Sequence, residues 1–473
     1  MPGSPSPMAV FVAGAPGIAT AFLAESLATS RAIAVATVAI DGARDDPARV
    51  FLDGALPDTR CVFLAADAGE LTPPGLDALA PGRWCRVERP RLLAEPSDEL
   101  QRVCRFLEIA YDQAMLGPVE RAGRAARAAA AGGELRTPLT SASTPSFGET
   151  LERTAGSLLI STYQTNRLVC ARIRDGAVNT HFRTYDKPMG IAVAPGRIAL
   201  GTRNEVWDLR DMPRVAAQIE PAGSHDACYL PRRRHVTGDI AVHDLAFAGG
   251  ELWLVATAFS CLATLDDTHS FVPRWRPPFI TALAPEDRCH LNGVAVIDDR
   301  PAYVTAVGTT DEPGGWRPAK AGGGVLIDVG SSQVAIAGLS MPHSPRWHQG
   351  RLWLLESGRG TLCAADPAAG TVEIVAELPG FTRGLAFAGQ TAFVGLSQIR
   401  ESATFGELPV TRRPGERQCG VWAVDLGTGA VSGFLRFDGL VQEIFDVAVL
   451  HRRRFPEIGE PGDPLTGRAY ALP

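Results

Sequence analysis

The sequence predicts a mainly β protein, a six-bladed β-propeller preceded by a small, truncated α/β domain. A short pattern recurs six times, each time at the start of a strand pair, and its copies are spaced like four-stranded propeller blades. Residues 1–122 follow a different periodicity, in which apolar runs of strand length alternate with helical spacing. The 49 Gly and 36 Pro among 473 residues suit many short strands joined by tight turns.

The α/β domain is expected over residues 1–122. Continuous apolar runs predict its strands, and apolar residues three and four apart predict its helices. The predicted strands lie near Ala9–Ala13, Ile33–Ile40 and Cys61–Ala65, and the predicted helices are Ala19–Ala28 and Asp98–Leu107.

A linker is predicted at residues 123–145. The segment 121–133 is nearly all Ala, Arg and Gly, and it breaks the periodicity on either side. The propeller is therefore expected to occupy residues 146–460, followed by a tail at residues 461–473.

The six copies of the repeat define the blades. Their third residues are at positions 190, 244, 293, 345, 384 and 446, so that successive copies are 54, 49, 52, 39 and 62 residues apart. Five copies are followed, after a short turn, by a second apolar strand. The sixth copy lacks one, but Ser157–Ile160 is unpaired at the start of the domain. We therefore expect the two ends of the domain to share one blade and close the ring.

Composition excludes several functions. A net charge of −6 argues against binding to nucleic acid, because its negatively charged phosphates attract basic proteins. The apolar run at residues 8–13 is too short to span a membrane. The nine Cys occur singly without a CxxC pair, which argues against a disulfide framework and a thiolate zinc site. We expect a cytoplasmic protein without nucleic-acid or membrane partners, and the sequence leaves its oligomeric state open.

One face of the propeller is predicted to bind a ligand. Turns between first and second strands are short, whereas the long polar insertions fall on the other face of the propeller. These insertions are residues 210–241, 266–289, 308–323 and 397–418. A small molecule or a peptide is the partner expected at this loop-rich face.

Three histidines start inner strands on that face. His243, His290 and His343 account for three of the nine His in the chain. Neutral imidazoles that converge on a channel axis suit a divalent metal such as zinc, iron, manganese or copper, and Asn292 could add an oxygen ligand. We expect a divalent metal as cofactor and no nucleotide.

Other polar residues are candidates for catalysis beside such a metal. Arg383 would fix an anionic group of a small substrate, and Asp244 or Asp239 would serve as base or orient a ligand. Further polar residues expected on this face are His225, Asp226, His235, Glu443 and Asp446. The structural alternative is that such residues hold the blades in register through hydrogen bonds to neighbouring backbone.

One alternative to a metal-dependent enzyme follows from the same face. A non-catalytic module for recognition of a peptide, glycan or protein would depend on Trp275, Trp316, Arg346 and Trp347. A serine hydrolase is not predicted, because no Gly-x-Ser-x-Gly elbow is present and nothing marks Ser357 as a nucleophile.

Residues 144–460 resemble a bacterial propeller family known only as a conserved hypothetical protein. The motifs that carry the resemblance are Thr144–Phe147, Gln164–Leu168, Lys187–Gly190, His235–Asp244 and His290–Gly293. The resemblance implies the propeller fold. It implies no activity, since that family has none that is settled.

The segments Pro188–Val193 and Leu291–Val296 resemble NHL and gluconolactonase-like six-bladed propellers. Asn292 matches in position an Asn that holds the metal in gluconolactonase-like proteins. Met189 and Arg383 lie where a calcium-type site needs oxygen ligands or neutral groups, so the resemblance does not extend to a lactonase centre.

The first domain resembles sulfotransferases at two places. Val87–Pro96 followed by Glu99–Ile109 is similar to the stretch in which a helix follows the central sheet of that family. Val10–Thr20 lies where the family has its phosphosulfate-binding strand, loop and helix. That loop normally carries a basic residue and a Ser/Thr pair, whereas this one has no Lys or Arg. The resemblance therefore implies a degenerate, non-catalytic fragment.

Overall fold

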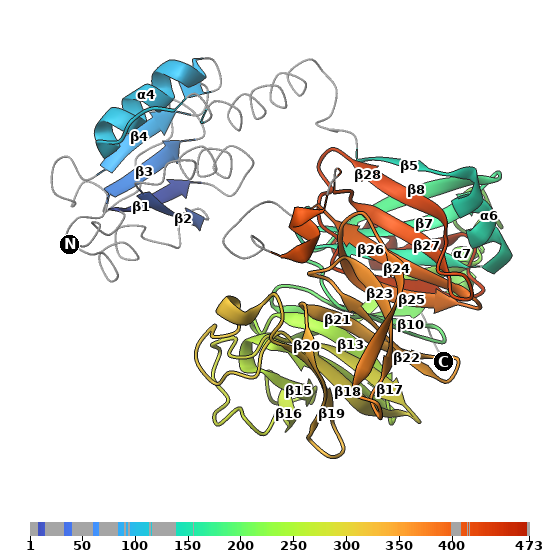
Figure 1. The fold of residues 1–473 in the computed structure, drawn as a ribbon. Helices are drawn as coiled ribbons and strands as arrows, with labels where there is room; N and C mark the ends of the chain where they lie inside the picture. The colour runs from blue at the N-terminus through green and yellow to red at the C-terminus, as the bar shows by residue number, and fades with distance from the viewer. Residues whose placement is uncertain are drawn as a thin grey trace. The chain divides into compact units, whose positions relative to one another are not determined.

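The structure is a computed structural model. It describes residues 8–14, 33–39, 60–65, 84–88, 91–92, 95–112, 115, 139–154, 156–398, 408–413, 415 and 417–470. The chain divides into two compact units, Met1–Thr137 and Pro138–Pro473 (Figure 1).

The first unit contains a parallel four-stranded sheet in the order β2-β1-β3-β4. Its strands are β1 Met8–Gly14, β2 Ile33–Ala39, β3 Arg60–Ala65 and β4 Trp84–Glu88, followed by helix α4 Pro96–Leu107. The three predicted strands and the second predicted helix are confirmed to within two residues, and β4 is a strand that the sequence did not predict. The helix predicted at Ala19–Ala28 and the segment 121–133 lie outside the described residues.

Helix α4 forms because its apolar residues fall on one side. Leu100, Val103, Cys104 and Leu107 follow the i, i+3, i+4, i+7 spacing, and all are buried in one core with residues of β3 and β4. The helix begins with Pro96 in its first turn and ends where Glu108 adopts a left-handed conformation, with φ at 58°.

The second unit is a six-bladed β-propeller, as predicted (Figure 1). Each blade is an antiparallel sheet, and its strands follow one another in order from the channel outward. Blade 1 comprises β9 Ile191–Ala194, β10 Arg197–Gly201, β11 Glu205–Asp211 and β12 Ala227–Val236. Blade 2 comprises β13 Val242–Ala248, β14 Glu251–Ala256, β15 Cys261–Thr264 and β16 Val272–Trp275. Blade 3 comprises β17 Leu291–Ile297, β18 Arg300–Ala306, β19 Gly324–Asp328 and β20 Val334–Leu339. Blade 4 comprises β21 Pro342–His348, β22 Arg351–Glu356, β23 Thr361–Asp366 and β24 Thr371–Glu377. Blade 5 comprises β25 Phe381–Ala388, β26 Thr391–Ser397, β27 Gly420–Asp425 and β28 Val431–Asp438. Blade 6 comprises β29 Asp446–Leu450, β6 Ser157–Thr162, β7 Arg167–Arg174 and β8 Ala177–Thr184.

Blade 6 closes the ring with strands from both ends of the domain. Strand β29 pairs antiparallel with β6, so that Asp446 faces Ser161 and Leu450 faces Ser157. The six inner strands contact one another in order around the ring, with β29 against β9. The predicted closure is therefore confirmed.

Two further strands extend the outer edges of blades. Strand β5, Thr140–Ser143, pairs with β28 of blade 5, although the sequence placed it in the linker. Strand β30, Pro456–Ile458, pairs parallel with β12 of blade 1. The predicted insertion 210–241 contains strand β12 and is therefore not a loop throughout. Outer strands offer unpaired N–H and C=O groups, and nearby extended segments satisfy them.

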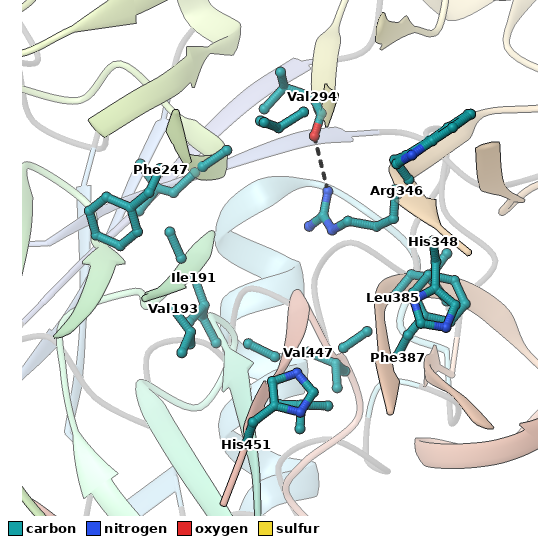
Figure 2. A pocket seen from close by; sticks show the side chains of 18 residues that line it. Ile191, Val193, Phe247, Val294, Arg346, His348, Leu385, Phe387, Val447 and His451 are labelled. Atoms are coloured by element: carbon teal, nitrogen blue, oxygen red, sulfur yellow. Dashed lines mark hydrogen bonds between the residues drawn. The ribbon is translucent and has the colours of Figure 1, made fainter. Parts of the chain in front are cut away.

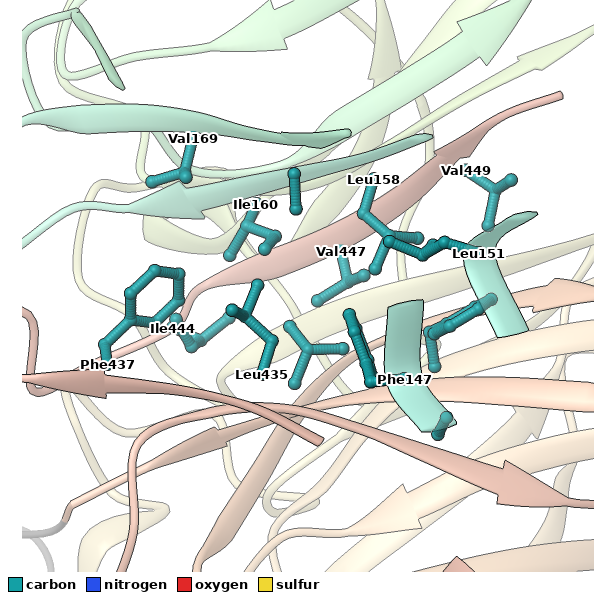
Figure 3. Close-up of a cluster of buried hydrophobic side chains, with 14 of the residues drawn as sticks. Phe147, Leu151, Leu158, Ile160, Val169, Leu435, Phe437, Ile444, Val447 and Val449 are labelled. Carbon is teal, nitrogen blue, oxygen red and sulfur yellow. The ribbon is translucent and has the colours of Figure 1, made fainter. Parts of the chain in front are cut away.

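An apolar core holds blades 5 and 6 together (Figure 3). Helix α6, Pro145–Thr154, buries Phe147 and Leu151 in a cluster that also contains Leu158 from β6, Leu435 from β28 and Val447 from β29. Full burial of one such side chain contributes about 1.5–3 kcal/mol. The interface between blade 5 and blade 6, which closes the ring, is therefore strongly apolar.

A charged cluster ties strand β30 to blade 6. The buried Glu457 carboxylate contacts Arg172, His181, Arg183 and His225. Burial opposes ionisation, but His181 and Arg183 outweigh it and lower the pKa of Glu457 to about 2.

The eight cysteines whose side chains are described are free and buried, in agreement with the absence of a disulfide framework. Within the described ranges, no helix is both long and apolar enough to cross a membrane.

Candidate metal centre

The inner strands of blades 2 to 5 share an irregularity near their start. The pairing register shifts between Val242 and Leu245 in β13, and equivalent shifts occur in β17, β21 and β25. A β-bulge interrupts the alternation of side chains between the two faces of a strand. Consecutive residues such as His243 and Asp244 can therefore both reach groups on other blades.

The structure brings together His243, His290 and His343, which we call the three-histidine site. Ring centroids are 4.8 Å apart for His243 and His290, 6.5 Å for His243 and His343, and 6.4 Å for His290 and His343. One nitrogen from each ring lies within 4.8 Å of the others, an arrangement that can hold a metal ion. The predicted convergence of these residues from blades 2, 3 and 4 is thus observed.

Local backbone structure orients two of the rings in the same way. The Nδ1 of His243 lies 3.3 Å from the Ala241 carbonyl, and the Nδ1 of His343 lies 2.9 Å from the Met341 carbonyl. Ala241 and Met341 have φ values of 51° and 46°, in the left-handed region that non-glycine residues rarely adopt. Such backbone strain is concentrated at functional sites in proteins.

A serine provides a second partner for His343. Ser357 Oγ donates to the Thr382 carbonyl at 2.5 Å, so at 3.0 Å it accepts from the Nδ1–H of His343. Ser357 is fully buried, which leaves its hydroxyl inaccessible to a substrate. Its hydrogen bond therefore orients the His343 ring.

A carboxylate orients the third ring. Both Asp287 oxygens lie 3.0 Å from Nδ1 of His290, and the Trp316 indole N–H donates to the same carboxylate at 3.0 Å. A carboxylate behind an imidazole fixes its tautomer and makes its other nitrogen more basic. Asp287 was not among the predicted site residues, although an Asp three residues before a candidate ligand was a usable signal.

All three rings therefore direct Nδ1–H outward to an acceptor. The remaining nitrogens, Nε2, carry the lone pairs and have no hydrogen-bond partner among the described residues. Burial, and then the nearby Arg383 charge, lower the pKa values of His243 and His343 well below the usual value. Both rings are neutral at pH 7, the form that binds metals.

Each imidazole also packs against one aromatic ring. The centroid distances are 5.0 Å from His243 to Phe445, 4.4 Å from His290 to Trp316 and 5.9 Å from His343 to Phe381. Rings packed in this way have little freedom to rotate away. The surroundings therefore help to hold the three rings in place.

Arg383 of blade 5 lies beside this site. Its guanidinium is 3.5 Å from the Phe445 ring centroid and 5.8 Å from that of Tyr163. Its Nη2 is buried without a hydrogen-bond partner among the described residues. Burial lowers the pKa of Arg383 to about 9, although Asp446 opposes this shift.

Asp244 belongs to a different cluster, which we call the hub ion cluster: Arg346, Asp244 and Asp446, from blades 4, 2 and 6. Arg346 donates to the Asp244 carboxylate at 2.7 and 3.0 Å and lies 3.7 Å from Asp446. Burial opposes the charge of Arg346, but the two carboxylates raise its pKa. Burial also raises the pKa of Asp446, with Arg346 opposing and Asp244 adding to the shift.

The hub carboxylates also bind backbone of the next blade. Val294 N–H of blade 3 donates to Asp244 at 3.0 Å, and Ile191 N–H of blade 1 donates to Asp446 at 2.9 Å. In blade 4, Ser344 Oγ accepts from Gly384 N–H of blade 5 at 3.1 Å. The structural alternative, that such residues hold blades in register, thus describes Asp244 and Asp446.

Two other proposed site residues have separate partners. Asn292 is buried, and its Oδ1 accepts from the Thr305 hydroxyl at 2.7 Å, while Nδ2 has no partner within the described part of the chain. Asp239 is exposed, lies 3.9 Å from Lys187 Nζ and accepts from Ala241 N–H. None of the contacts described for these two residues reaches the three-histidine site.

The remaining polar residues assigned to this face are dispersed. His225 contacts Glu457, Asp226 accepts from the Arg454 and Phe455 amides, and His235 contacts the His269 and Ser270 carbonyls. The expectation that they belong to the site is wrong, because β12 carries this segment along the outer edge of blade 1. Burial raises the pKa of Glu443 to about 7, but no described contact links it to the histidines.

A cavity lies beyond the hub ion cluster (Figure 2). It measures about 410 Å³ and is lined by the later residues of all six inner strands, among them Val193, Phe247, His348, Phe387 and Val447. Arg346 borders it and donates to the Val294 carbonyl. Along β13 and β21 the order is therefore histidine site, ion cluster and then cavity.

Residues assigned to a recognition surface are mostly engaged within the fold. Trp316 is buried against His290, Trp275 donates to Ser332 Oγ, and Arg346 is in the hub ion cluster. Trp347 is 43% exposed and lines the cavity beyond the hub instead of the histidine site.

The fold and site define a six-bladed propeller with a cluster of three histidines at one end of its axis. Residues 145–458 match the family described as a domain of unknown function (DUF4915), and the chain belongs to this family. The match covers all six blades and begins and ends within two residues of the propeller expected from the sequence. No curated protein matches the chain.

Two solved structures are similar to the chain. One, titled as the crystal structure of a nidogen/laminin complex, has a TM-score of 0.39 and 9% identity, and covers 62% of this chain and 98% of that chain. The other is a protein of unknown function from Bacteroides caccae, with a TM-score of 0.39, 8% identity and the same coverage. Similarities at this level support no statement about function.

Proposed function

We propose that the protein is a metal-dependent enzyme, in which His243, His290 and His343 bind a divalent transition metal that acts on a small substrate. One observation carries the proposal: three imidazoles from three blades each bring a ring nitrogen within 4.8 Å of the other two. Each ring is oriented by a separate acceptor behind it. Chance packing of histidines against a channel wall does not require such orientation at every ring.

The chemistry of the donors suits a metal of the zinc or iron type. Three nitrogen ligands leave at least one coordination position for water or substrate, as in catalytic zinc sites. Zinc–nitrogen bonds of about 2.0–2.1 Å place three tetrahedral ligands roughly 3.3 Å apart. The ligand nitrogens of this site lie within 4.8 Å of one another, so metal binding would draw the rings closer together.

Metal titration tests the proposal. The full-length protein, stripped with a chelator, is titrated with Zn²⁺ by calorimetry and with Co²⁺ by visible spectroscopy. We expect one ion per chain and a cobalt spectrum of low coordination number. The double variant His243→Ala, His290→Ala should lose this binding, because one histidine alone cannot hold the ion.

A matched control uses the other end of the channel. The double variant His348→Ala, His451→Ala removes two histidines that line the cavity beyond the hub ion cluster. It should bind metal like the unmodified protein. Absence of stoichiometric metal, or equal binding by the two double variants, would contradict the proposal.

A recognition module is the second candidate function for this face. Three of its four proposed contact residues are engaged within the fold, and the fourth lies at the cavity beyond the hub. The metal centre is therefore the better supported function.

For residues 1–122 we propose a degenerate sulfotransferase-like fragment without activity. The parallel sheet and the helix α4 after β4 support this interpretation, while the loop after β1 lies outside the described residues. Titration of the full-length protein with a phosphosulfate nucleotide tests it, and measurable binding would contradict the loss of that role.

A further inference from the structure

Two arginines are directed to the inner part of the propeller, and their surroundings differ. Arg346 donates to the Asp244 carboxylate through both terminal nitrogens, with Asp446 as a second carboxylate nearby. Among the described residues, Arg383 has no carboxylate bonded to it, and its Nη2 is buried without a partner. Its described neighbours are the faces of Phe445 and Tyr163. Among the residues that the structure describes, Arg346 is hydrogen-bonded to a carboxylate, whereas Arg383 feels only the charge of Asp446 without a bond to it.

Arg383 lies at the rim of the three-histidine site. It occupies the second position of the repeat in blade 5, where blade 2 has His243, and it lies one blade beyond His343. Phe445, the residue at this position in blade 6, contacts both the His243 ring and the Arg383 guanidinium. The charge of Arg383 also acts on His243 and His343. An unsatisfied guanidinium therefore lies next to the proposed metal ligands.

The charge balance of the site points to an anion. An imidazole binds a metal in its neutral form, so three such ligands would not cancel the charge of a divalent ion, and Arg383 adds a further positive charge. Asp287 behind His290 offsets only part of this. A buried cation without a partner is costly, and a guanidinium is suited to binding carboxylate or phosphate oxygens in its plane.

We propose that the substrate of this centre carries an oxyanion group that binds Arg383 while another of its atoms lies at the metal. The inference rests on the proposed function, because the second contact of the substrate is with the metal. It extends the proposed function by naming the substrate class. Arg383 is the specificity-determining residue in this arrangement. Carboxylates and phosphates share the required chemistry, and the test separates them.

The test measures anion binding to the full-length protein. Oxalate and inorganic phosphate are titrated by calorimetry into the zinc-loaded unmodified protein and into Arg383→Gln. Loss of one charge-assisted contact should weaken the preferred anion at least about tenfold. Zinc affinity should stay the same or rise, because the substitution removes a positive charge near the ion. A larger loss for oxalate assigns a carboxylate substrate, and a larger loss for phosphate assigns a phosphate ester.

Two further variants control the experiment. Arg351→Gln removes an equal charge from an exposed arginine paired with Glu373 and should leave anion binding unchanged. Arg383→Lys keeps the charge without the planar fork and should restore part of the affinity. Thermal unfolding shows whether each variant is folded, and Arg383→Met replaces Arg383→Gln if the latter is not.

The outcomes for the two proposals are distinct. Equal anion affinity in the unmodified protein and the folded Arg383 variant overturns the inference and leaves the metal centre intact. If the unmodified protein binds no zinc, the proposed function fails. The same anion titrations of the metal-free protein then decide whether Arg383 binds an anion. Equal anion affinity in the unmodified protein and the Arg383 variant would overturn the inference in that case too.

Discussion

Two sets of polar groups follow each other along the propeller axis and differ in how far the protein satisfies them. The hub ion cluster pairs Arg346 with Asp244 and Asp446, and backbone amides of neighbouring blades donate to the same two carboxylates. In the three-histidine site, the free ring nitrogens and Arg383 Nη2 have no partner among the described residues. We call the hub ion cluster the saturated set, because its groups are hydrogen-bonded within the protein, and this set joins blades. We call the three histidines with Arg383 the unsaturated set, and this set is available to a ligand.

Polar residues of one repeat copy therefore have different roles, some structural and some functional. His243 and Asp244 are neighbours in β13, but one belongs to the unsaturated set and the other to the saturated set. Buried polar groups without partners are rare because each one reduces stability. Arg383 Nη2 is such a group and lies beside three imidazoles, and an external ligand is the simplest physical explanation.

The largest effect should come from breaking the saturated set. Arg346→Met leaves Asp244 and Asp446 buried without their cation and should cost about 3–5 kcal/mol of unfolding free energy. Arg383→Met removes a charge with no bonded carboxylate and should be neutral or stabilising. Denaturant unfolding of the two variants, measured in parallel without metal, gives the comparison.

Equal destabilisation by the two substitutions would show that Arg383 also has a structural partner. In that case the distinction between the two sets would be lost.

A smaller effect is expected from the residues behind the histidines. Asp287→Asn keeps the shape of the side chain but removes the charge that holds the His290 Nδ1–H, and zinc affinity should fall about 10–100-fold. Calorimetric titration measures this change. Ser357→Ala tests His343 in the same way, but with a weaker loss, because the Met341 carbonyl still accepts from that ring.

Zinc affinity unchanged by Asp287→Asn would mean that His290 is not a ligand. The site would then lack the third donor on which the proposal depends.

The smallest effect concerns pH. The pKa values of His243 and His343 lie below 6.5 in the folded protein, so the unfolded chain takes up protons first as the pH falls. Their contribution to stability is therefore complete above about pH 6.5 and is lost below it. A tenfold change in a proton dissociation constant corresponds to about 1.4 kcal/mol. Urea unfolding of the metal-free protein at about pH 7.5 and about pH 5.5, on either side of the ordinary histidine pKa, should show this loss.

The double variant His243→Gln, His343→Gln serves as the control, since it has neither titrating ring. Its stability should depend less on pH over this interval. An equal dependence in both proteins would place the titrating groups elsewhere.

Much of the architecture could be predicted from the repeat. The six copies of one pattern identified the blades, and the unpaired segment at Ser157–Ile160 identified the closure of the ring by β29 and β6. Because the inner strands start at the same end of the channel, the convergence of His243, His290 and His343 could be predicted from their places near those starts, although the three residues hold different positions in the repeat. The sequence by itself thus determined the fold and the nearness of three candidate ligands.

The roles of individual side chains were decided only by the tertiary structure. Asp244 looked like a catalytic base, but its partner Arg346 is 102 residues away and two blades further around the ring. Asp287 and Ser357 were not recognised, because their hydrogen bonds to the ring nitrogens depend on how loops and bulges turn the backbone. Repeat position sets where a residue lies around the axis. Which neighbour satisfies it depends on contacts between blades, and those contacts have no fixed spacing along the chain.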